Sequence, residues 1–210
     1  SCTGIVAGYL GTNALECLIE NVYVSGTVSG IQQVGGIGGI FAKGTVRNCY
    51  ADVKVIGSSR AGGIVAEPRN AVVVENCFAT GTLYSTGNAG GIAGGLNGNN
   101  PTIKGCIAWN ERIDGEPVSG RVIGWQSNTY TKATDCYAKK DMIIAWGPNK
   151  GMTGADANTA GTYDWGNNKT AICHGITTEN SVDAAKKIGW STDIWDLSGV
   201  TPLLKSFNDK

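Results

Sequence analysis

The chain has 210 residues with 17 basic and 17 acidic side chains, and charged residues make up only 16% of it. This balance provides no net field for recruiting nucleic acid or an anionic membrane. No stretch approaches the about 18 consecutive apolar residues of a membrane span. We therefore expect no nucleic-acid partner and no membrane span.

A short block recurs five times along the chain, at intervals of 27 to 30 residues. A period in this range is typical of repeat proteins in which one supersecondary unit stacks on the next. A Gly-Ile block precedes it at the same period, most clearly as Gly35-Gly36-Ile37-Gly38-Gly39, so each repeat contains at least two short strands. The five copies are Asn21-Val22-Tyr23-Val24, Asn48-Cys49-Tyr50-Ala51, Asn76-Cys77-Phe78-Ala79, Gly105-Cys106-Ile107-Ala108 and Asp135-Cys136-Tyr137-Ala138.

The segment after each block alternates with period 2, as a half-buried strand requires. In the second repeat, Cys49, Ala51, Val53 and Val55 share one parity, which we take as inward. The residue before each cysteine is Asn, Gly or Asp, the types that best tolerate a left-handed backbone, so it predicts a corner between two sheets. The sequence thus predicts an all-β right-handed parallel β-helix of about five coils.

Four of the seven cysteines occupy one repeat position. Side chains at one position of parallel strands point the same way, which predicts an inward ladder of free thiols at Cys49, Cys77, Cys106 and Cys136. No C-x-x-C pair is present, so no metal site is predicted. A disulfide at Cys2 or Cys17 stays open as an alternative, and Cys173 also lies off the ladder.

The repeats resemble the GLUG-motif family, with Ile in the Leu position of the Gly-Leu-any-Gly signature. The residues that carry the resemblance are Gly36-Ile37-Gly38-Gly39, Gly63-Ile64-Val65-Ala66 and Gly91-Ile92-Ala93-Gly94, with the tails that follow them. GLUG repeats occur in large bacterial surface proteins, some described as immunoglobulin A1 peptidases and some as haemagglutinin-like adhesins. The resemblance implies a non-catalytic stalk or adhesive segment and covers residues 1–142.

Residues 143–210 differ from the repeats and predict a long loop plus a C-terminal capping segment within the same structural domain. The stretch 147–169 is rich in Gly, Asn and Thr and predicts the loop. Ser181 predicts the N-cap of a short helix that runs through Ile188 and ends at Gly189. We expect the segment with Trp190 and Trp195 to cover the last coil, because an uncovered coil exposes its edge and its core.

The six tryptophans all follow residue 108, and exposed tryptophans can stack on sugar rings or anchor a protein partner. Trp109, Trp125, Trp146 and Trp165 therefore form the candidate binding surface, with pinning of the long loop by Trp146 and Trp165 as the structural alternative.

Catalytic and metal-binding patterns are weak in this sequence. The only histidine, His174, lacks an H-E-x-x-H context or a recognisable triad partner. Isolated acids such as Asp52, Glu75 and Glu111 form no carboxylate ladder of the kind that polysaccharide lyases and glycosidases use. The string from Asp156 to Asn167 matches an EF-hand loop only in part. We predict no enzyme, no cofactor and no metal.

The sequence thus predicts a monomeric, non-catalytic repeat segment of a bacterial surface or secreted protein, with a host glycan or host protein as partner. The absence of an apolar leader at Ser1 indicates an excised or processed fragment, with further coils ahead of it and a peptidase domain elsewhere in the parent protein. A carbohydrate-active β-helix and a pure structural spacer are the alternatives.

Overall fold

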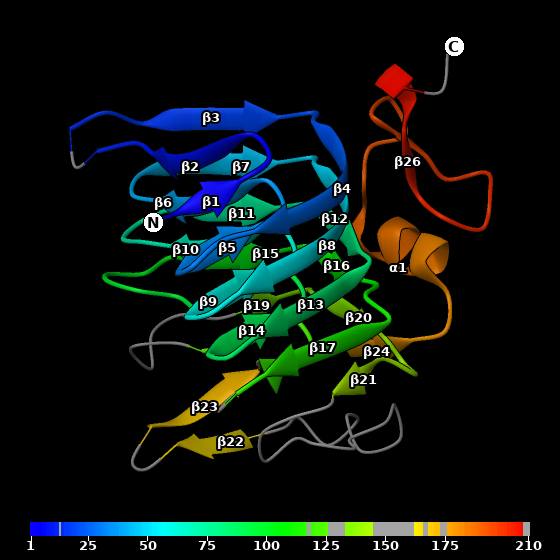
Figure 1. The fold of residues 1–210 in the computed structure, drawn as a ribbon. Coiled ribbons are helices and arrows are strands. Elements are labelled where there is room, and N and C mark those ends of the chain that lie inside the picture. The colour runs from blue at the N-terminus through cyan, green and yellow to red at the C-terminus, as the bar shows by residue number, and fades with distance from the viewer. Residues whose placement is uncertain are drawn as a thin grey trace.

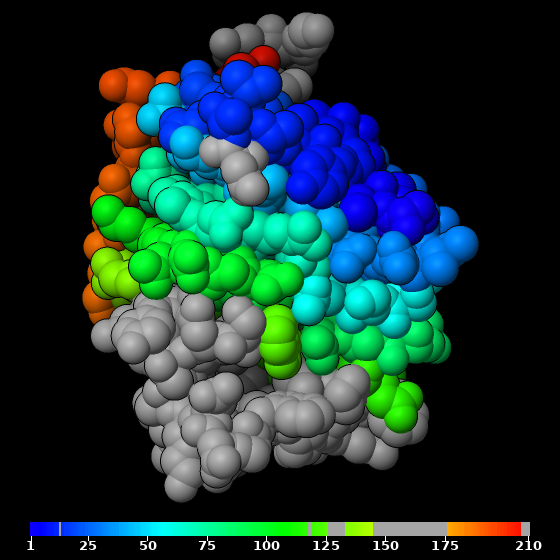
Figure 2. All heavy atoms as spheres, turned by 90° about the vertical axis from the view of Figure 1, so that its left-hand side faces the viewer, coloured from blue at the N-terminus to red at the C-terminus, as the bar shows by residue number. Residues whose placement is uncertain are grey.

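Four parallel β-sheets, which we name A to D in chain order, form the walls of a solenoid of about five coils. The computed structural model describes residues 1–12, 14–116, 119–125, 133–144, 162–165, 168–172 and 176–207. The coils lie above one another in Figure 1 and appear as successive bands from blue to green in Figure 2. The predicted solenoid is therefore confirmed, with four walls where the sequence predicted at least two strands per repeat.

In each coil the chain passes the walls in the order A, B, C, D, and sheet B has strands from the first three coils only, followed by the isolated bridges of Ala93 with Val65 and Ile123. Sheet A contains β1 (Thr3–Gly4), β5 (Gln33–Gly35), β9 (Arg60–Gly62), β14 (Asn88–Gly90) and β18 (Ser119–Gly120). Sheet B contains β2 (Ala7–Leu10), β6 (Gly38–Phe41) and β10 (Val65–Pro68). Sheet C contains β3 (Cys17–Glu20), β7 (Gly44–Arg47), β11 (Val73–Glu75), β15 (Thr102–Lys104) and β19 (Ala133–Thr134).

Sheet D is the longest wall. It contains β4 (Tyr23–Ser29), β8 (Tyr50–Gly57), β12 (Phe78–Thr80), β13 (Thr82–Ser85), β16 (Ile107–Ala108), β17 (Arg112–Gly115), β20 (Tyr137–Lys139), β21 (Ile143–Ile144) and β24 (Ile176–Thr178). Equivalent residues of successive coils pair directly, as in the register Tyr23 with Tyr50 and Tyr50 with Phe78.

The corners between sheets C and D have the backbone geometry that the sequence predicts. The φ angle is 56° at Asn21, 52° at Asn48, 52° at Asn76, 58° at Gly105 and 51° at Asp135. This left-handed region is costly for most side chains and cheapest for Gly, Asn and Asp. The repeated residue types at this position therefore reflect a repeated backbone requirement.

The Gly-Ile block forms the bend between sheets A and B instead of the packed strand that we expected. A Cβ atom at Gly35 would collide with the Gly38 carbonyl oxygen, and Gly62 faces Val65 in the same way. Ile37 lies at the bend and points inward, and its equivalents Ile64 and Ile92 are also fully buried. The glycines thus permit a sharp bend, while the isoleucine fills the core beneath it.

The four ladder cysteines are buried free thiols, as the repeat position predicts. Each thiol donates to the carbonyl of the residue two positions before it, at 3.2 Å for Cys49, 3.2 Å for Cys77, 3.3 Å for Cys106 and 3.4 Å for Cys136. These contacts satisfy the sulfur locally, so the ladder packs as small apolar side chains. Cys2 and Cys17 are free thiols too, and Cys173 lies outside the described residues.

The helix α1 (Ser181–Ile188) has nearly the predicted bounds, but its N-cap is Asn180 and not Ser181. Asn180 has an extended backbone, and its Oδ1 accepts from the amides of Val182 at 2.9 Å and Asp183 at 3.1 Å. Ser181 is already helical and buried, so it cannot act as the cap. Gly189 ends the helix at φ 84°, as predicted.

The C-terminal segment lies along the outer side of sheet D and does not cover the last coil as we expected. Its buried side chains pack against the outward row Phe78, Ile107 and Tyr137, which comes from three successive coils. The segment rises from α1 to β26 (Leu203–Leu204), which pairs with β25 (Trp195–Asp196) and is followed by the 3-10 turn η2 (Lys205–Phe207). In Figure 1 β26 lies at the height of β3 and β4, beside the first coil.

The stretch 147–169, which we expected to be a loop, contains part of a hairpin. Strand β22 (Thr162–Trp165) pairs antiparallel with β23 (Asn168–Ile172). Residues 147–161 lie outside the described part of the chain. In the described residues no helix is long and apolar enough to cross a membrane.

Candidate functional site

Glu67 is the one acidic residue that is fully buried among the described residues. It lies in β10, where the next residue, Pro68, pairs with Phe41 of the core. Because successive side chains of a strand point to opposite faces, Glu67 and its partner Ile40 lie on the outer face of sheet B. A buried carboxylate is very costly unless it is paired and hydrogen-bonded, so its partners define the site.

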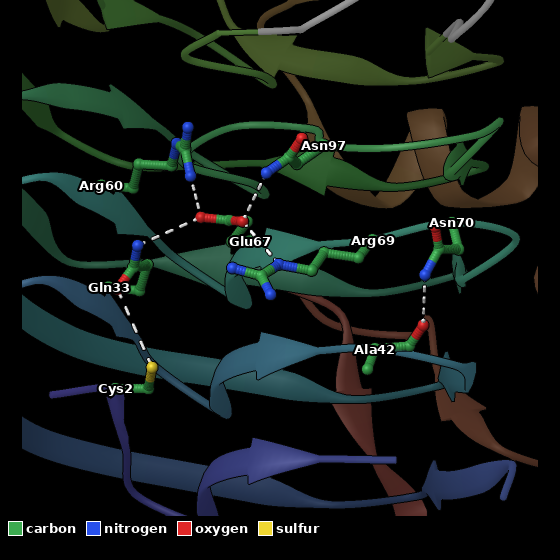
Figure 3. Close-up of polar contacts among 8 residues, drawn as sticks. All are labelled: Cys2, Gln33, Ala42, Arg60, Glu67, Arg69, Asn70 and Asn97. Atoms are coloured by element: carbon green, nitrogen blue, oxygen red, sulfur yellow. Dashed lines mark hydrogen bonds and ion pairs between the residues drawn. The ribbon is translucent and has the colours of Figure 1, made fainter. Parts of the chain in front are cut away.

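Both carboxylate oxygens of Glu67 are occupied (Figure 3). Oε1 accepts from Arg69 Nε at 2.6 Å and from Asn97 Nδ2 at 2.8 Å. Oε2 accepts from Gln33 Nε2 at 3.2 Å and forms an ion pair with Arg60. We call Gln33, Arg60, Glu67, Arg69 and Asn97 the Glu67 network.

The Glu67 network ties neighbouring coils together across the outside of the solenoid. Gln33 and Arg60 reach Glu67 from strands β5 and β9 of sheet A, so the outer faces of sheets A and B turn toward each other here. Asn97 belongs to the following coil, and its backbone forms an isolated parallel β-bridge with Arg69. The thiol of Cys2 extends the contacts to the first coil through Gln33 Oε1, at 3.8 Å.

The network carries two guanidinium groups for one carboxylate. Burial lowers the pKa of Arg60, and the like charge of Arg69 lowers that pKa further. Arg60 also lies 4.9 Å from the ring centroid of Trp125, a cation–π contact that favours the charged form. With both carboxylate oxygens engaged by donors, Glu67 is poorly placed to move a proton.

Trp125 and Trp109 do not form one binding surface. Trp125 lies over Arg60, outside sheets A and B. Trp109 is half-buried and packs against the cluster between sheet D and the C-terminal segment. Trp146 and the side chain of Trp165 lie outside the described residues, so their part of the prediction stays untested.

Sequence reasoning missed the Glu67 network because Glu67 occurs in a single coil and belongs to no repeated block. One signal was present. At the same position of sheet B the preceding coils carry Tyr9 and Ile40, so an acid here replaces apolar side chains. An acid in an otherwise apolar row predicts a paired, buried charge.

Two shallow grooves lie side by side on the wall, near the turn from sheet B to sheet C. The first, which we call the corner groove, encloses about 400 Å³ and is lined by Ala42, Lys43, Asn70, Ala71, Asn99 and Asn100. The second, the wall groove, encloses about 340 Å³ on the outside of sheet C and is lined by Glu16, Cys17, Leu18, Gly44, Thr45, Arg47 and Glu75. An ion pair of 3.2 Å between Lys43 and Glu16 joins them.

The corner groove is rich in side-chain amides. Asn70 donates to the Ala42 carbonyl at 3.3 Å, which fixes the groove floor (Figure 3). Asn99 and Asn100 are exposed at its rim. An amide side chain offers two donors and one acceptor, a combination suited to the hydroxyl groups of a sugar or to a peptide backbone.

The described residues contain no group of three or more His, Cys, Asp or Glu side chains that could hold a metal ion. His174 and residues 156–161 of the EF-hand-like string lie outside the described part of the chain.

The continuous core, the αL corners and the parallel walls define the chain as a β-solenoid repeat protein. No family model matches it, and no curated protein matches it either, so the GLUG resemblance stays a prediction. Among solved structures it is similar to one described as "a putative immunoglobulin A1 protease from Bacteroides ovatus", with a TM-score of 0.72 and 25% sequence identity. The similarity covers 96% of this chain but only 63% of that protein.

Proposed function

We propose that this chain is a non-catalytic β-solenoid segment of a bacterial surface or secreted protein and that it binds a host glycan or host protein. The observation that carries the proposal is the corner groove, in which amide and ammonium groups surround a shallow depression on a rigid wall. The hydrogen-bonded coils beneath it keep these groups in place, which lowers the entropy cost of binding.

The structural similarity supports a bacterial origin for the proposal. The similar protein is of bacterial origin and is described by an activity toward immunoglobulin A1. Because this chain spans 63% of its length, a protease activity of the whole protein would not have to reside in the shared part. Immunoglobulin A1 is therefore the first host protein to test as a binding partner.

If the chain were carbohydrate-active, its active site would lie in the wall groove. Glu16 and Glu75 both line it, together with Arg47. The Glu16 side chain is 71% exposed, whereas the acid of a glycosidase is usually held in apolar surroundings that raise its pKa. Binding without turnover is therefore the better-supported reading of the two grooves.

The test is a glycan array combined with a pull-down of host secretory proteins that include immunoglobulin A1. We expect the double variant Lys43→Ala, Asn99→Ala to bind at least about tenfold more weakly than the wild type, because it loses two polar groups of the corner groove. The control Lys54→Ala removes an exposed lysine from sheet D and should bind normally. No wild-type binding in either assay would refute the proposal, and glycan cleavage would favour the carbohydrate-active alternative.

A further inference from the structure

The outer face of sheet C carries a row of alternating charges. Each strand from β3 to β15 buries one residue in the core, namely Ile19, Val46, Val74 and Ile103. The residue after each of these points outward, because successive side chains of a strand alternate between the two faces. The outward residues pair in register from coil to coil. They form what we call the charge row, with the signs minus, plus, minus and plus: Glu20, Arg47, Glu75 and Lys104.

The charge row is open to solvent and only partly neutralised within the chain. Glu20 and Arg47 form an ion pair of 2.7 Å, in which their side chains are still 39% and 43% exposed. Within the described part of the chain, neither Glu75 nor Lys104 has an ion-pair partner. An exposed pair contributes at most about 1 kcal/mol. The charges of the row therefore remain available to a partner.

Reversal of the charge row inverts the sign at every position. A second copy can be related by a two-fold axis that runs along the strands, between Arg47 and Glu75, and then presents the same row in the opposite order. Glu20 faces Lys104 of the second copy, Arg47 faces Glu75 of the second copy, and each contact occurs twice. A copy that ran in the same direction would place like charges opposite each other, which is unfavourable.

The neighbouring outward row fits the same arrangement. It lies two residues before the charge row, pairs in the same register and consists of Leu18, Thr45, Val73 and Thr102. The two-fold axis places Leu18 over Thr102 of the second copy, and Thr45 over Val73. Leu18 is 54% exposed, so the contact would remove apolar surface from water without burying a charge.

We infer that sheet C is a self-association surface on which a second copy of this chain docks face to face, with the two solenoids running in opposite directions. The formal net charge of the chain is zero, so no overall repulsion opposes the approach. The charge row spans only about 14 Å, which is less than a stable interface needs, so the dimer is weak and sensitive to salt. This dimer would replace the monomer that the sequence predicts. The inference makes no use of the corner groove, so it and the proposed function can fail independently.

Charge reversal tests the two facing pairs. Arg47→Glu places an acid opposite Glu75 of the second copy, and Glu75→Arg places a base opposite Arg47, so each variant has two like-charge contacts. We expect sedimentation equilibrium in low salt to show wild-type dimers, and each variant to raise the dissociation constant at least about tenfold. Sodium chloride at about 0.5 M should also weaken the wild-type dimer.

A mixture of the two variants supplies the decisive measurement. The Arg47→Glu chain has an acid at both central positions of the row, and the Glu75→Arg chain has a base at both. The two-fold axis therefore brings opposite charges together again when the two chains meet. We expect heterodimers with nearly the wild-type dissociation constant, although neither variant dimerises well alone. This recovery also separates a lost interface from a lost fold, because a misfolded chain would not regain a partner.

The control Lys54→Glu reverses an exposed charge on sheet D and should leave the dissociation constant unchanged. A wild-type chain that stays monomeric in low salt at about 1 mM would overturn the inference. A dimer that Arg47→Glu does not weaken, or a mixture that forms no heterodimer, would overturn it as well.

Discussion

Single residues determine the path of the chain at the corners of this solenoid, where the backbone conformation is unfavourable for most side chains. The corners at Asn21, Asn48, Asn76, Gly105 and Asp135 all have a positive φ, and all have residue types that accept it. This part of the fold could be predicted from sequence because a steric requirement repeated in every coil leaves a repeated residue type.

Replacement of Asn76 tests the corner requirement. We expect Asn76→Val to lower the free energy of unfolding by about 2 kcal/mol or more, because a β-branched side chain is strained at φ 52°. Asn76→Gly should change it by less than about 1 kcal/mol, since glycine adopts this region freely. Urea unfolding followed by circular dichroism measures both, and equal losses would contradict a backbone origin.

Replacement of Glu67 tests the buried network. Glu67→Gln leaves Arg60 and Arg69 without their counter-charge and turns an amide donor toward guanidinium donors. We expect a loss of about 3–5 kcal/mol in unfolding free energy. The matched change Glu20→Gln breaks an exposed pair with Arg47 and should cost less than about 1 kcal/mol. Similar losses for the two variants would show that burial does not determine how much Glu67 contributes to the free energy of unfolding.

At the scale of elements, inward rows were easier to predict than outward ones. Alternation within a strand identified the cysteine ladder, because its positions are small and apolar in every coil. The outward row Phe78, Ile107 and Tyr137 has the same period, but the sequence does not indicate which residues pack against it. That cover comes from residues 181–204, and contacts at such a sequence separation leave no local pattern. The indole of Trp190, for example, donates to the Gly105 carbonyl at 2.8 Å.

Two thiols of the ladder, Cys77 and Cys136, should be unreactive in the folded chain. Burial raises the pKa of Cys77, and hydrogen bonds with Cys106 and Cys49 raise it further. The pKa of Cys136 is raised by its hydrogen bond with Cys106 and then by burial. We expect these two thiols to resist a thiol reagent at pH 8 in the native state and to react after unfolding, as peptide mapping of the labelled cysteines would show.

The same pKa shifts predict a pH dependence of stability. A thiol whose pKa is higher in the folded state is kept protonated by folding. Its stabilising contribution to the free energy of unfolding is therefore complete below the pKa of the unfolded chain, about 8.5, and declines as the pH rises above that value. Cys77 and Cys136 should therefore contribute a fall in the free energy of unfolding above about pH 8.5. Hydrogen bonds with neighbouring thiols lower the pKa of Cys49 and, against the effect of burial, that of Cys106, so these two thiols contribute in the opposite direction. Cys77→Ala combined with Cys136→Ala should flatten this slope, and an unchanged slope would assign it to other groups.

At the scale of the whole molecule, the repeat predicted the stacking but not how the chain returns along it. The parallel register follows from equivalent residues at intervals of 27 to 30 positions. The position of the C-terminal segment instead depends on contacts between sheet D and residues far along the chain. The sequence predicts that this segment covers the last coil because an open end exposes apolar side chains, whereas the structure places it on the outward row Phe78, Ile107 and Tyr137 of sheet D.

The return of the chain along sheet D determines how the molecule would respond to a pulling force. A force applied between Ser1 and β26 would first load the first coil and the C-terminal segment, because β26 lies at the height of β3 and β4 in Figure 1. In a single-molecule force trace we expect the C-terminal segment to release first. Coils should then peel from the first-coil edge in steps of 27 to 30 residues, each adding about 100 Å of contour length.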